Sequence, residues 1–153
     1  MLCKIVSGGQ TGVDRAGLDA GMEAGLPVGG WCPKGRLAED GVVPEKYPLI
    51  EMGSASYTSR TEQNVIDSDG TLVLNRGKLS GGTKRTVEFA IKHNRPYLTV
   101  QLDDEPNVEA IMEWVKAQSI RTLNVAGPRE SKCPGIYMES IDLLKSLLKR
   151  MSR

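Results

Sequence analysis

A chain of 153 residues is long enough for one domain with a substantial core, and 39% hydrophobic with 25% charged residues excludes a disordered chain. The 20 lysines and arginines nearly balance 19 aspartates and glutamates, so the net charge of +1 provides no overall field that attracts nucleic acid or a membrane surface. We therefore expect a single domain over residues 1–153 in which any recognition of anions is local.

No targeting or membrane-spanning segment is evident. The first six residues lack a basic stretch followed by a long apolar run, and no window approaches the roughly 20 apolar residues of a membrane span. The three cysteines, Cys3, Cys32 and Cys133, form no Cys-x-x-Cys pair and are odd in number. We therefore expect a cytoplasmic protein without a disulfide framework or a structural metal.

Short apolar runs alternate with segments of helical periodicity along the chain. Buried strands are expected at residues 2–6, 28–32, 71–74, 97–102 and 122–126, with helices at 10–25, 59–66 and 81–93. Two more helices are marked by apolar stripes, one at Val108, Ile111, Met112 and Val115 and a terminal one at Ile141, Leu144, Leu148 and Met151. Ser59 or Thr61 could cap the second helix. The polar stretch 33–48 has no periodicity, and a loop of that length is usually functional or mobile. This alternation predicts an α/β fold with three layers and a mostly parallel sheet.

The first helix is expected to pack unusually close to the sheet. Small residues recur on one stripe of residues 10–25, which consists of Val13, Ala16, Gly17, Ala20, Gly21 and Ala24. Interior glycines cost about 1 kcal/mol each in helix propensity. Close packing, or a ligand nearby, has to compensate for that cost.

A glycine-rich loop follows the first expected strand and opens the first helix. Such loops let backbone amides approach an anion, and a helix N-terminus adds about half a positive charge. The alternative is a tight turn with a capped helix, in which Thr11 is the cap. Asp14 would repel a phosphate, and it could instead complement the helix dipole, accept from a hydroxyl or amine of the ligand, or pair with an arginine. The candidate binding residues here are Gly8, Gly9, Gln10, Thr11, Asp14 and Arg15.

A second glycine-rich loop opens the helix at residues 81–93. Its candidate residues are Gly81, Gly82, Thr83 and Thr86. If the two loops lie on adjacent strands, they make a two-sided phosphate cradle at the carboxyl edge of the sheet, where open α/β sheets bind ligands. The two loops together predict an oxyanion site where Gly8–Thr11 meets Gly81–Thr83.

Further candidates come from the polar segments around these loops. Trp31 offers a flat surface for a heterocycle, and Lys34 and Arg36 offer cations. Arg60 and Asn64 share a helix face, and Arg129 follows the last strand. For each of these residues, an ordinary position in an exposed loop or on a solvated helix face is an alternative of equal weight to a role in binding.

No catalytic constellation is apparent. The one histidine, His93, stands at an expected helix end, where it complements the helix dipole. No Ser-His-Asp set and no metal-ligand spacing are recognisable, so we expect neither catalytic residues nor a metal site.

Five segments together resemble the molybdenum carrier protein family, in order along the chain. They are residues 8–16 (GGQTGVDRA), 29–36 (GGWCPKGR) with 39–41 (EDG), 60–70 (RTEQNVIDSDG), 81–86 (GGTKRT) and 123–131 (LNVAGPRES). The resemblance implies a Rossmann-like fold of the SLOG superfamily, whose members bind nucleotide-like ligands, and a homo-oligomer. It also implies binding of the molybdenum cofactor, a pterin that carries a phosphate and a dithiolene-bound oxo-metal.

Two other functions are compatible with such a fold. One is that of the lysine-decarboxylase-like phosphoribohydrolases, which cleave nucleoside monophosphates and carry a Pro-Gly-Gly-x-Gly-Thr-x-x-Glu signature. Aligning Gly82 and Thr83 with that signature puts Thr86 where the essential glutamate belongs, although Glu88 is near. The other is a sensor of a nucleotide-derived ligand. We expect a carrier that binds a phosphate-bearing small molecule and does not turn it over.

Overall fold

The computed structural model describes residues 1–152. Its central sheet has five strands, and every strand is parallel to its neighbours. The strand order is β2-β1-β9-β7-β8. The strands are β1 (Lys4–Val6), β2 (Val28–Gly29), β7 (Gly70–Asn75), β8 (Tyr97–Gln101) and β9 (Thr122–Ala126).

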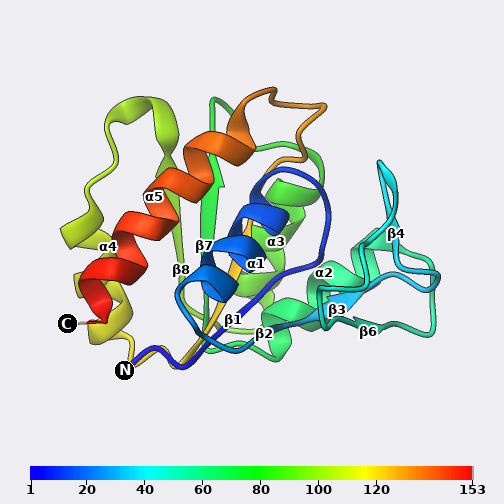
Figure 1. The fold of residues 1–153 in the computed structure, drawn as a ribbon, viewed down its shortest axis with the longest axis horizontal. Coiled ribbons are helices and arrows are strands. Elements are labelled where there is room, and N and C mark those ends of the chain that lie inside the picture. Colours follow the sequence, from blue (N-terminus) through cyan, green and yellow to red (C-terminus); the bar gives the residue numbers. More distant parts are fainter. Residues whose placement is uncertain (153) are drawn as a thin grey trace.

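Helices cover both faces of this sheet (Figure 1). On one face, α5 (Ile136–Met151) packs against both α1 (Val13–Glu23) and α4 (Val108–Ala117). On the other, α2 (Tyr57–Ile66) packs against α3 (Gly81–Lys92). A short 3-10 turn, Leu102–Asp104, follows β8. The three-layer Rossmann-like α/β fold is confirmed. No helix within residues 1–152 combines the length and apolar character needed to cross a membrane.

The position of β9 decides where the glycine-rich loops lie. Ile5 of β1 pairs with Leu123 of β9, and Leu123 also pairs with Gly70 of β7. The two loops do not follow adjacent strands, because β9 enters between β1 and β7, so the condition for a two-sided phosphate cradle is not met. The carboxyl ends of three strands, not two, face the space between the loops.

The segment expected as one strand at residues 28–32 divides at Gly30. Gly30 has a φ of 122°, and a Cβ there would stand 2.3 Å from the Ser7 carbonyl oxygen. The chain therefore leaves the central sheet after β2, and β3 (Trp31–Cys32) pairs with β6 (Ile50–Glu51) instead. A hairpin of β4 (Leu37–Ala38) and β5 (Gly41–Val42) occupies part of the segment expected to be irregular. These elements form a small lobe beside the sheet (Figure 1).

Helix boundaries differ from expectation mainly at their starts. Helix α2 begins at Tyr57, and its cap is Ser56, whose hydroxyl accepts from the Ser59 N–H at 3.3 Å, rather than Ser59 or Thr61. Helix α1 begins at Val13 after Gly12, so Thr11 does not cap it. Helix α5 begins at Ile136 and contains the expected stripe from Ile141 onward, and α1 ends at Glu23, which leaves Ala24 exposed.

The close approach of α1 to the sheet is confirmed. A Cβ on Gly17 would stand 2.9 Å from the Val125 Cβ, and one on Gly21 would stand 2.7 Å from the Val28 Cγ1. Val13, Ala16 and Ala20 on the same stripe are fully buried. The small residues therefore serve packing, which offsets their cost in helix propensity.

We predict that Gly127→Ala lowers the free energy of unfolding by at least the roughly 1–3 kcal/mol typical of overpacking. A Cβ on Gly127, just after β9, would stand 2.2 Å from the Leu74 carbonyl oxygen and 2.6 Å from the Val13 Cγ2. Urea denaturation measures the loss. Gly53→Ala is the matched control, because a Cβ on Gly53 meets nothing within 4 Å. Equal stability of the two variants would show that the strand end is not tightly packed.

Candidate functional site

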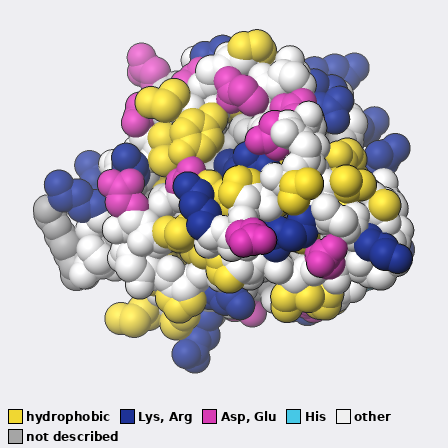
Figure 2. All heavy atoms as spheres, turned by 45° about the vertical axis from the view of Figure 1, so that its right-hand side comes forward, with side chains coloured by type: hydrophobic (Ala, Val, Ile, Leu, Met, Phe, Trp, Pro, Cys, Tyr) yellow, Lys and Arg dark blue, Asp and Glu magenta, His cyan; other side chains and the backbone are white. Residues whose placement is uncertain are grey.

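A cavity of about 270 Å³ lies at the carboxyl ends of β1, β9 and β7. Four cations and one carboxylate contribute to its walls, although the whole protein is nearly neutral. Figure 2 shows basic, acidic and apolar side chains interspersed on the face that carries the small lobe. The lining residues are Gly8, Gln10, Asp14, Tyr57, Thr58, Arg60, Thr61, Asn64, Ser80, Gly82, Thr83, Arg85, Thr86, Asn124, Val125, Ala126, Gly127, Pro128, Arg129 and Lys132.

The carboxylate of Asp14 lies against the first glycine-rich loop. The Asp14 carboxylate, through Oδ2, accepts from the Gln10 N–H at 3.2 Å and from Arg60 Nη1 at 3.0 Å. Burial raises the pKa of Asp14 above its ordinary value, and the guanidinium of Arg60 opposes that shift. The pairing of Asp14 with an arginine, one of the alternatives from sequence, is confirmed. A phosphate at this loop would have to lie against a carboxylate.

The glycines of this loop make room for other parts of the protein. A Cβ on Gly8 would lie 1.6 Å from Arg60 Nη1, so the guanidinium rests directly on the loop backbone. A Cβ on Gly12, whose φ is 79°, would lie 2.4 Å from the Pro128 carbonyl oxygen. A Cβ on Gly9 would meet Leu49 at 2.6 Å. Close packing within the protein therefore explains why glycines occupy these three positions, without a contribution from a ligand.

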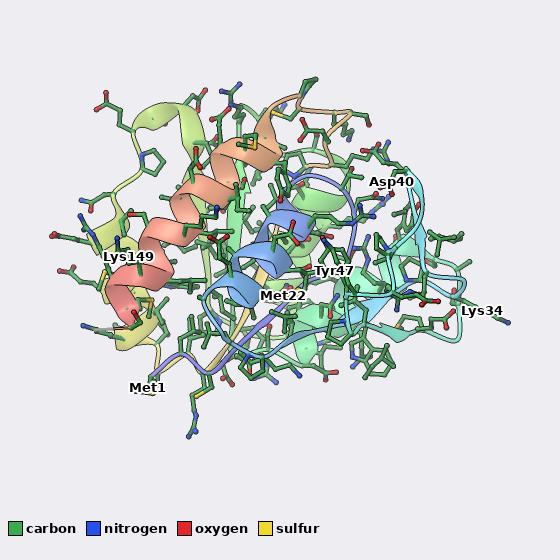
Figure 3. All side chains as sticks on the ribbon, in the orientation of Figure 1. Met1, Met22, Lys34, Asp40, Tyr47 and Lys149 are labelled. Atoms are coloured by element: carbon green, nitrogen blue, oxygen red, sulfur yellow. The ribbon has the colours of Figure 1, made fainter. Side chains whose placement is uncertain are left out.

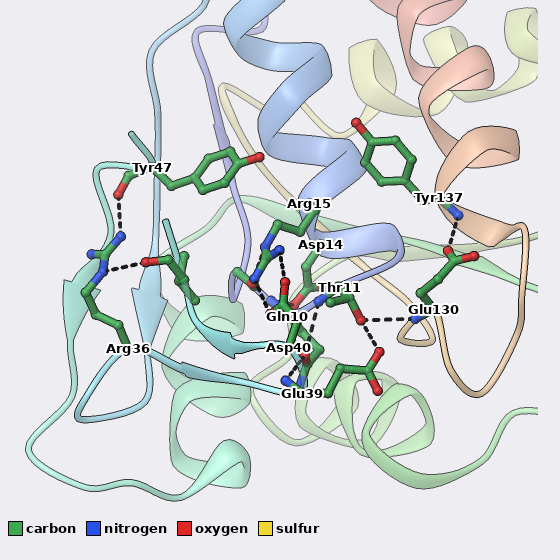
Figure 4. A network of polar contacts seen from close by, with 12 residues as sticks. Gln10, Thr11, Asp14, Arg15, Arg36, Glu39, Asp40, Tyr47, Glu130 and Tyr137 are labelled. Atoms are coloured by element: carbon green, nitrogen blue, oxygen red, sulfur yellow. Dashed lines mark hydrogen bonds and ion pairs between the residues drawn. The ribbon is translucent and has the colours of Figure 1, made fainter. Parts of the chain in front are cut away.

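The turn of the β4–β5 hairpin is fastened to this loop by two carboxylates (Figure 4). Asp40 receives both terminal nitrogens of Arg15, at 2.7 and 2.9 Å. Glu39 accepts from the Thr11 hydroxyl and from the Ser131 hydroxyl and N–H. Burial works against ionisation of Glu39, but these hydrogen bonds outweigh it and lower its pKa. Thr11 and Arg15 thus hold the hairpin and lie outside the cavity lining.

The second glycine-rich loop is open to a ligand. Ser80 is the N-cap of α3 without a side-chain capping bond, and no acceptor within residues 1–152 receives the N–H groups of Gly81, Gly82 and Thr83. Lys132 Nζ lies 2.6 Å from where a Cβ on Gly81 would be, which puts the ammonium over the start of the helix. Unpaired N–H groups beside a cation favour an anion at this position.

Two further cations line the cavity. Arg85, in the first turn and a half of α3, has no carboxylate within 4.0 Å among residues 1–152, and neither has Lys132. Arg129 Nε is 3.5 Å from Glu39 Oε1. Thr86, which lines the wall, donates its hydroxyl to the Gly82 carbonyl at 2.9 Å. The two cavity cations without a carboxylate partner, Arg85 and Lys132, therefore both stand at the start of α3.

Besides Thr11 and Arg15, five residues expected at the site are outside the cavity lining: Gly9 and Gly81 of the two loops, and three residues of the small lobe. Arg36 donates to the backbone carbonyls of residues 43, 44, 47 and 49, so it organises the loop before β6. Trp31 donates its indole N–H to Asp67 at 2.7 Å. Lys34 is exposed at the outer end of the small lobe (Figure 3). The division of the chain at Gly30 carries all three away from the sheet edge.

Of the other candidates, the structure gathers Gly8, Gln10, Asp14, Arg60, Asn64, Gly82, Thr83, Thr86 and Arg129 around one cavity. Asn64 also fixes the small lobe, because its amide exchanges two hydrogen bonds with the Trp31 backbone, at 2.8 and 3.0 Å. The aromatic wall expected of Trp31 comes instead from Tyr57, whose ring has the Arg60 guanidinium 5.5 Å from its centre.

Sequence reasoning missed Arg85 and Lys132. Arg85 stands two residues after the Gly-Gly-Thr turn. That position indicates a binding residue, since side chains in the first turns of a helix can reach a ligand at its N-terminus. Nothing in the sequence around Lys132 indicates a role in this site. This lysine reaches the site only because the loop after β9 crosses over the start of α3. Within residues 1–152 no group of three or more His, Cys, Asp or Glu side chains is positioned to hold a metal ion.

A family model for circularly permutated YpsA proteins of the SLOG class matches residues 5–148. The chain belongs to the circularly permutated YpsA SLOG family. A crystal structure from Syntrophus aciditrophicus SB, described as a putative molybdenum carrier protein, is 48% identical, with a TM-score of 0.93 and coverage of 96% of this chain and 95% of that chain.

A second solved structure, of (E)-4-hydroxy-3-methyl-but-2-enyl diphosphate reductase, has 13% identity and a TM-score of 0.40, and covers 95% of this chain and 59% of that chain. That similarity is too remote to support an argument. A comparison with curated proteins gives no match.

We predict that Arg60→Met destabilises the protein by about 3–5 kcal/mol at neutral pH, because it leaves the Asp14 carboxylate buried without its partner. Burial raises the pKa of Asp14 in the folded state, so the ionised form is disfavoured there. The variant should therefore be most stable at low pH, and lose stability as the pH rises through that raised pKa. Urea titrations across pH 4–8 measure this. A destabilisation that is independent of pH would contradict the buried ion pair as its cause.

Proposed function

We propose that this protein binds a phosphate-bearing small molecule in the cavity, with the phosphate at the N-terminus of α3. The observation that carries the proposal is the set of unpaired N–H groups at Gly81–Thr83, with Lys132 over them, Arg85 on the same helix and Arg129 in the wall of the same cavity. Dipole, amides and cations all favour an anion at the same place. The first glycine-rich loop differs because the Asp14 carboxylate lies against it and already accepts from the Gln10 N–H and from Arg60.

We infer that the ligand is carried rather than consumed, and that the molybdenum cofactor is the leading ligand. The 48% identical neighbour described as a putative molybdenum carrier protein supports this inference. The cofactor is a pterin that bears a phosphate, which suits a cavity with one cationic end. Its metal is held by the dithiolene of the pterin, so the lack of a metal-ligand cluster among residues 1–152 is compatible with this cargo.

We predict that Lys132→Ala and Arg85→Ala each weaken the binding of inorganic phosphate and of guanosine 5′-monophosphate at least tenfold. A charge-assisted hydrogen bond contributes about 1.5–3 kcal/mol, and tenfold in affinity corresponds to about 1.4 kcal/mol. Calorimetric titration measures both ligands. Lys34→Ala is the control, because it removes the same charge from the outer end of the small lobe. A crystal soaked in phosphate with the anion bound away from Gly81–Thr83 would refute the assignment.

One observation favours a second function, hydrolysis of a nucleoside monophosphate. Asp14 is the one carboxylate that lines the cavity within residues 1–152, and burial raises its pKa, as in many general acids and bases. Glu88, which sequence left as a replacement for the missing glutamate, is exposed on α3 and outside the lining. Any hydrolase activity would therefore depend on Asp14.

We predict that the purified protein releases no free base from nucleoside 5′-monophosphates. Asp14 is held by Arg60 and by the Gln10 N–H, and this arrangement fixes the carboxylate instead of leaving it to activate water. Chromatography of the incubated nucleotides detects free base and ribose phosphate. Release that disappears in Asp14→Asn would establish a hydrolase and overturn the carrier function.

A further inference from the structure

The cavity has two chemically different ends. The end over β7 is the cationic one, formed by the start of α3 with Arg85 and Lys132. The other end lies over β1 and contains Asp14 with Arg60. Since β9 separates β1 from β7, the two ends are two strand spacings apart, or about 10 Å. A single phosphate cannot occupy both.

Asp14 offers an unused acceptor at the second end. Only 6% of the residue is exposed, and Oδ2 takes both of its hydrogen bonds. Oδ1 receives no donor from residues 1–152. The fully buried side-chain atoms without a partner are Arg60 Nε, Gln101 Oε1 and Ser140 Oγ, and Asp14 Oδ1 is not among them. It is therefore reachable from the cavity.

A second acceptor stands between the two ends. Asn124, on β9, is 3% exposed and lines the cavity, and its amide nitrogen donates to the Thr71 hydroxyl at 3.2 Å. That hydrogen bond orients the amide so that its oxygen has no donor within residues 1–152. Asn124 Oδ1 is not among the fully buried atoms without a partner either, so it is also reachable from the cavity and can accept from a ligand.

We propose that Asp14 is a specificity-determining residue that accepts an N–H or O–H of the ligand about 10 Å from its phosphate. This inference rests on the proposed function and adds the orientation of the ligand, which spans from α3 across the end of β9 to β1. The ligand class is a phosphate monoester whose far end carries hydrogen-bond donors, such as the ring N–H groups of a purine or pterin or the hydroxyls of a sugar. A simple anion fills only the α3 end.

Asp14→Asn tests this proposal, because it keeps the size of the side chain and an oxygen for Arg60 and the Gln10 N–H. We expect guanosine 5′-monophosphate to bind at least tenfold more weakly to the variant. Inorganic phosphate should bind equally well or about twofold more tightly, since a like charge about 10 Å away repels it only weakly in water. Asp142→Asn, on an exposed face of α5, is the control for the change in charge. An equal effect on both ligands would overturn the proposal.

The wild-type protein provides a second test that needs no variant. Guanosine 5′-monophosphate should bind at least tenfold more tightly than inorganic phosphate. Purine riboside 5′-monophosphate lacks N–H donors on its ring, and 2′,3′-dideoxyguanosine 5′-monophosphate lacks the sugar hydroxyls. One of these two nucleotides should bind little more tightly than inorganic phosphate, which identifies the group that donates to Asp14. If both bind as tightly as guanosine 5′-monophosphate, Asp14 does not recognise hydrogen-bond donors of the ligand. If the wild type binds no phosphate at all, it is the proposed function that fails.

Discussion

The ion pair of Asp14 with Arg60 is the interaction on which the rest of the site depends. It joins the start of α1 to α2 across the first glycine-rich loop, and both side chains are more than nine-tenths buried. The guanidinium lies on the backbone of Gly8, where any larger residue would displace it. A buried ion pair is weak evidence for stability, because desolvation offsets the attraction, but losing one partner is costly. The pair therefore fixes geometry: it closes the β1 end of the cavity to anions and leaves the α3 end open.

The small lobe is attached to this framework both by apolar packing and by charged hydrogen bonds. Its core is separate from that of the main sheet, and consists of residues such as Cys32, Val43 and Leu49 around Leu18 of α1. Glu39 and Asp40 fasten the hairpin turn to the loops after β1 and β9. Because Glu39 also lies near Arg129, the hairpin is linked to one wall of the cavity.

Placement of positive charge explains how a nearly neutral protein can attract an anion. Arg85 on α3 and Lys132 in the loop after β9 have no carboxylate within 4.0 Å among residues 1–152, whereas Arg15, Arg36 and Arg60 are all engaged with protein acceptors. Counting cations along the chain could not separate these groups. What distinguishes them is whether a carboxylate or carbonyl comes close after folding.

The sequence by itself determined the layers of the fold, the parallel sheet and the close packing of α1, because these follow from periodicity and from the small residues at positions such as Gly17 and Gly21. It also indicated pairing with an arginine as one of three alternatives for Asp14. Only the tertiary structure decided that β9 lies between the two glycine-rich loops, that Gly30 diverts the chain into the small lobe, and that Lys132 reaches α3. These features depend on strand order and on contacts between segments far apart in the chain, and local propensity contains no information about either.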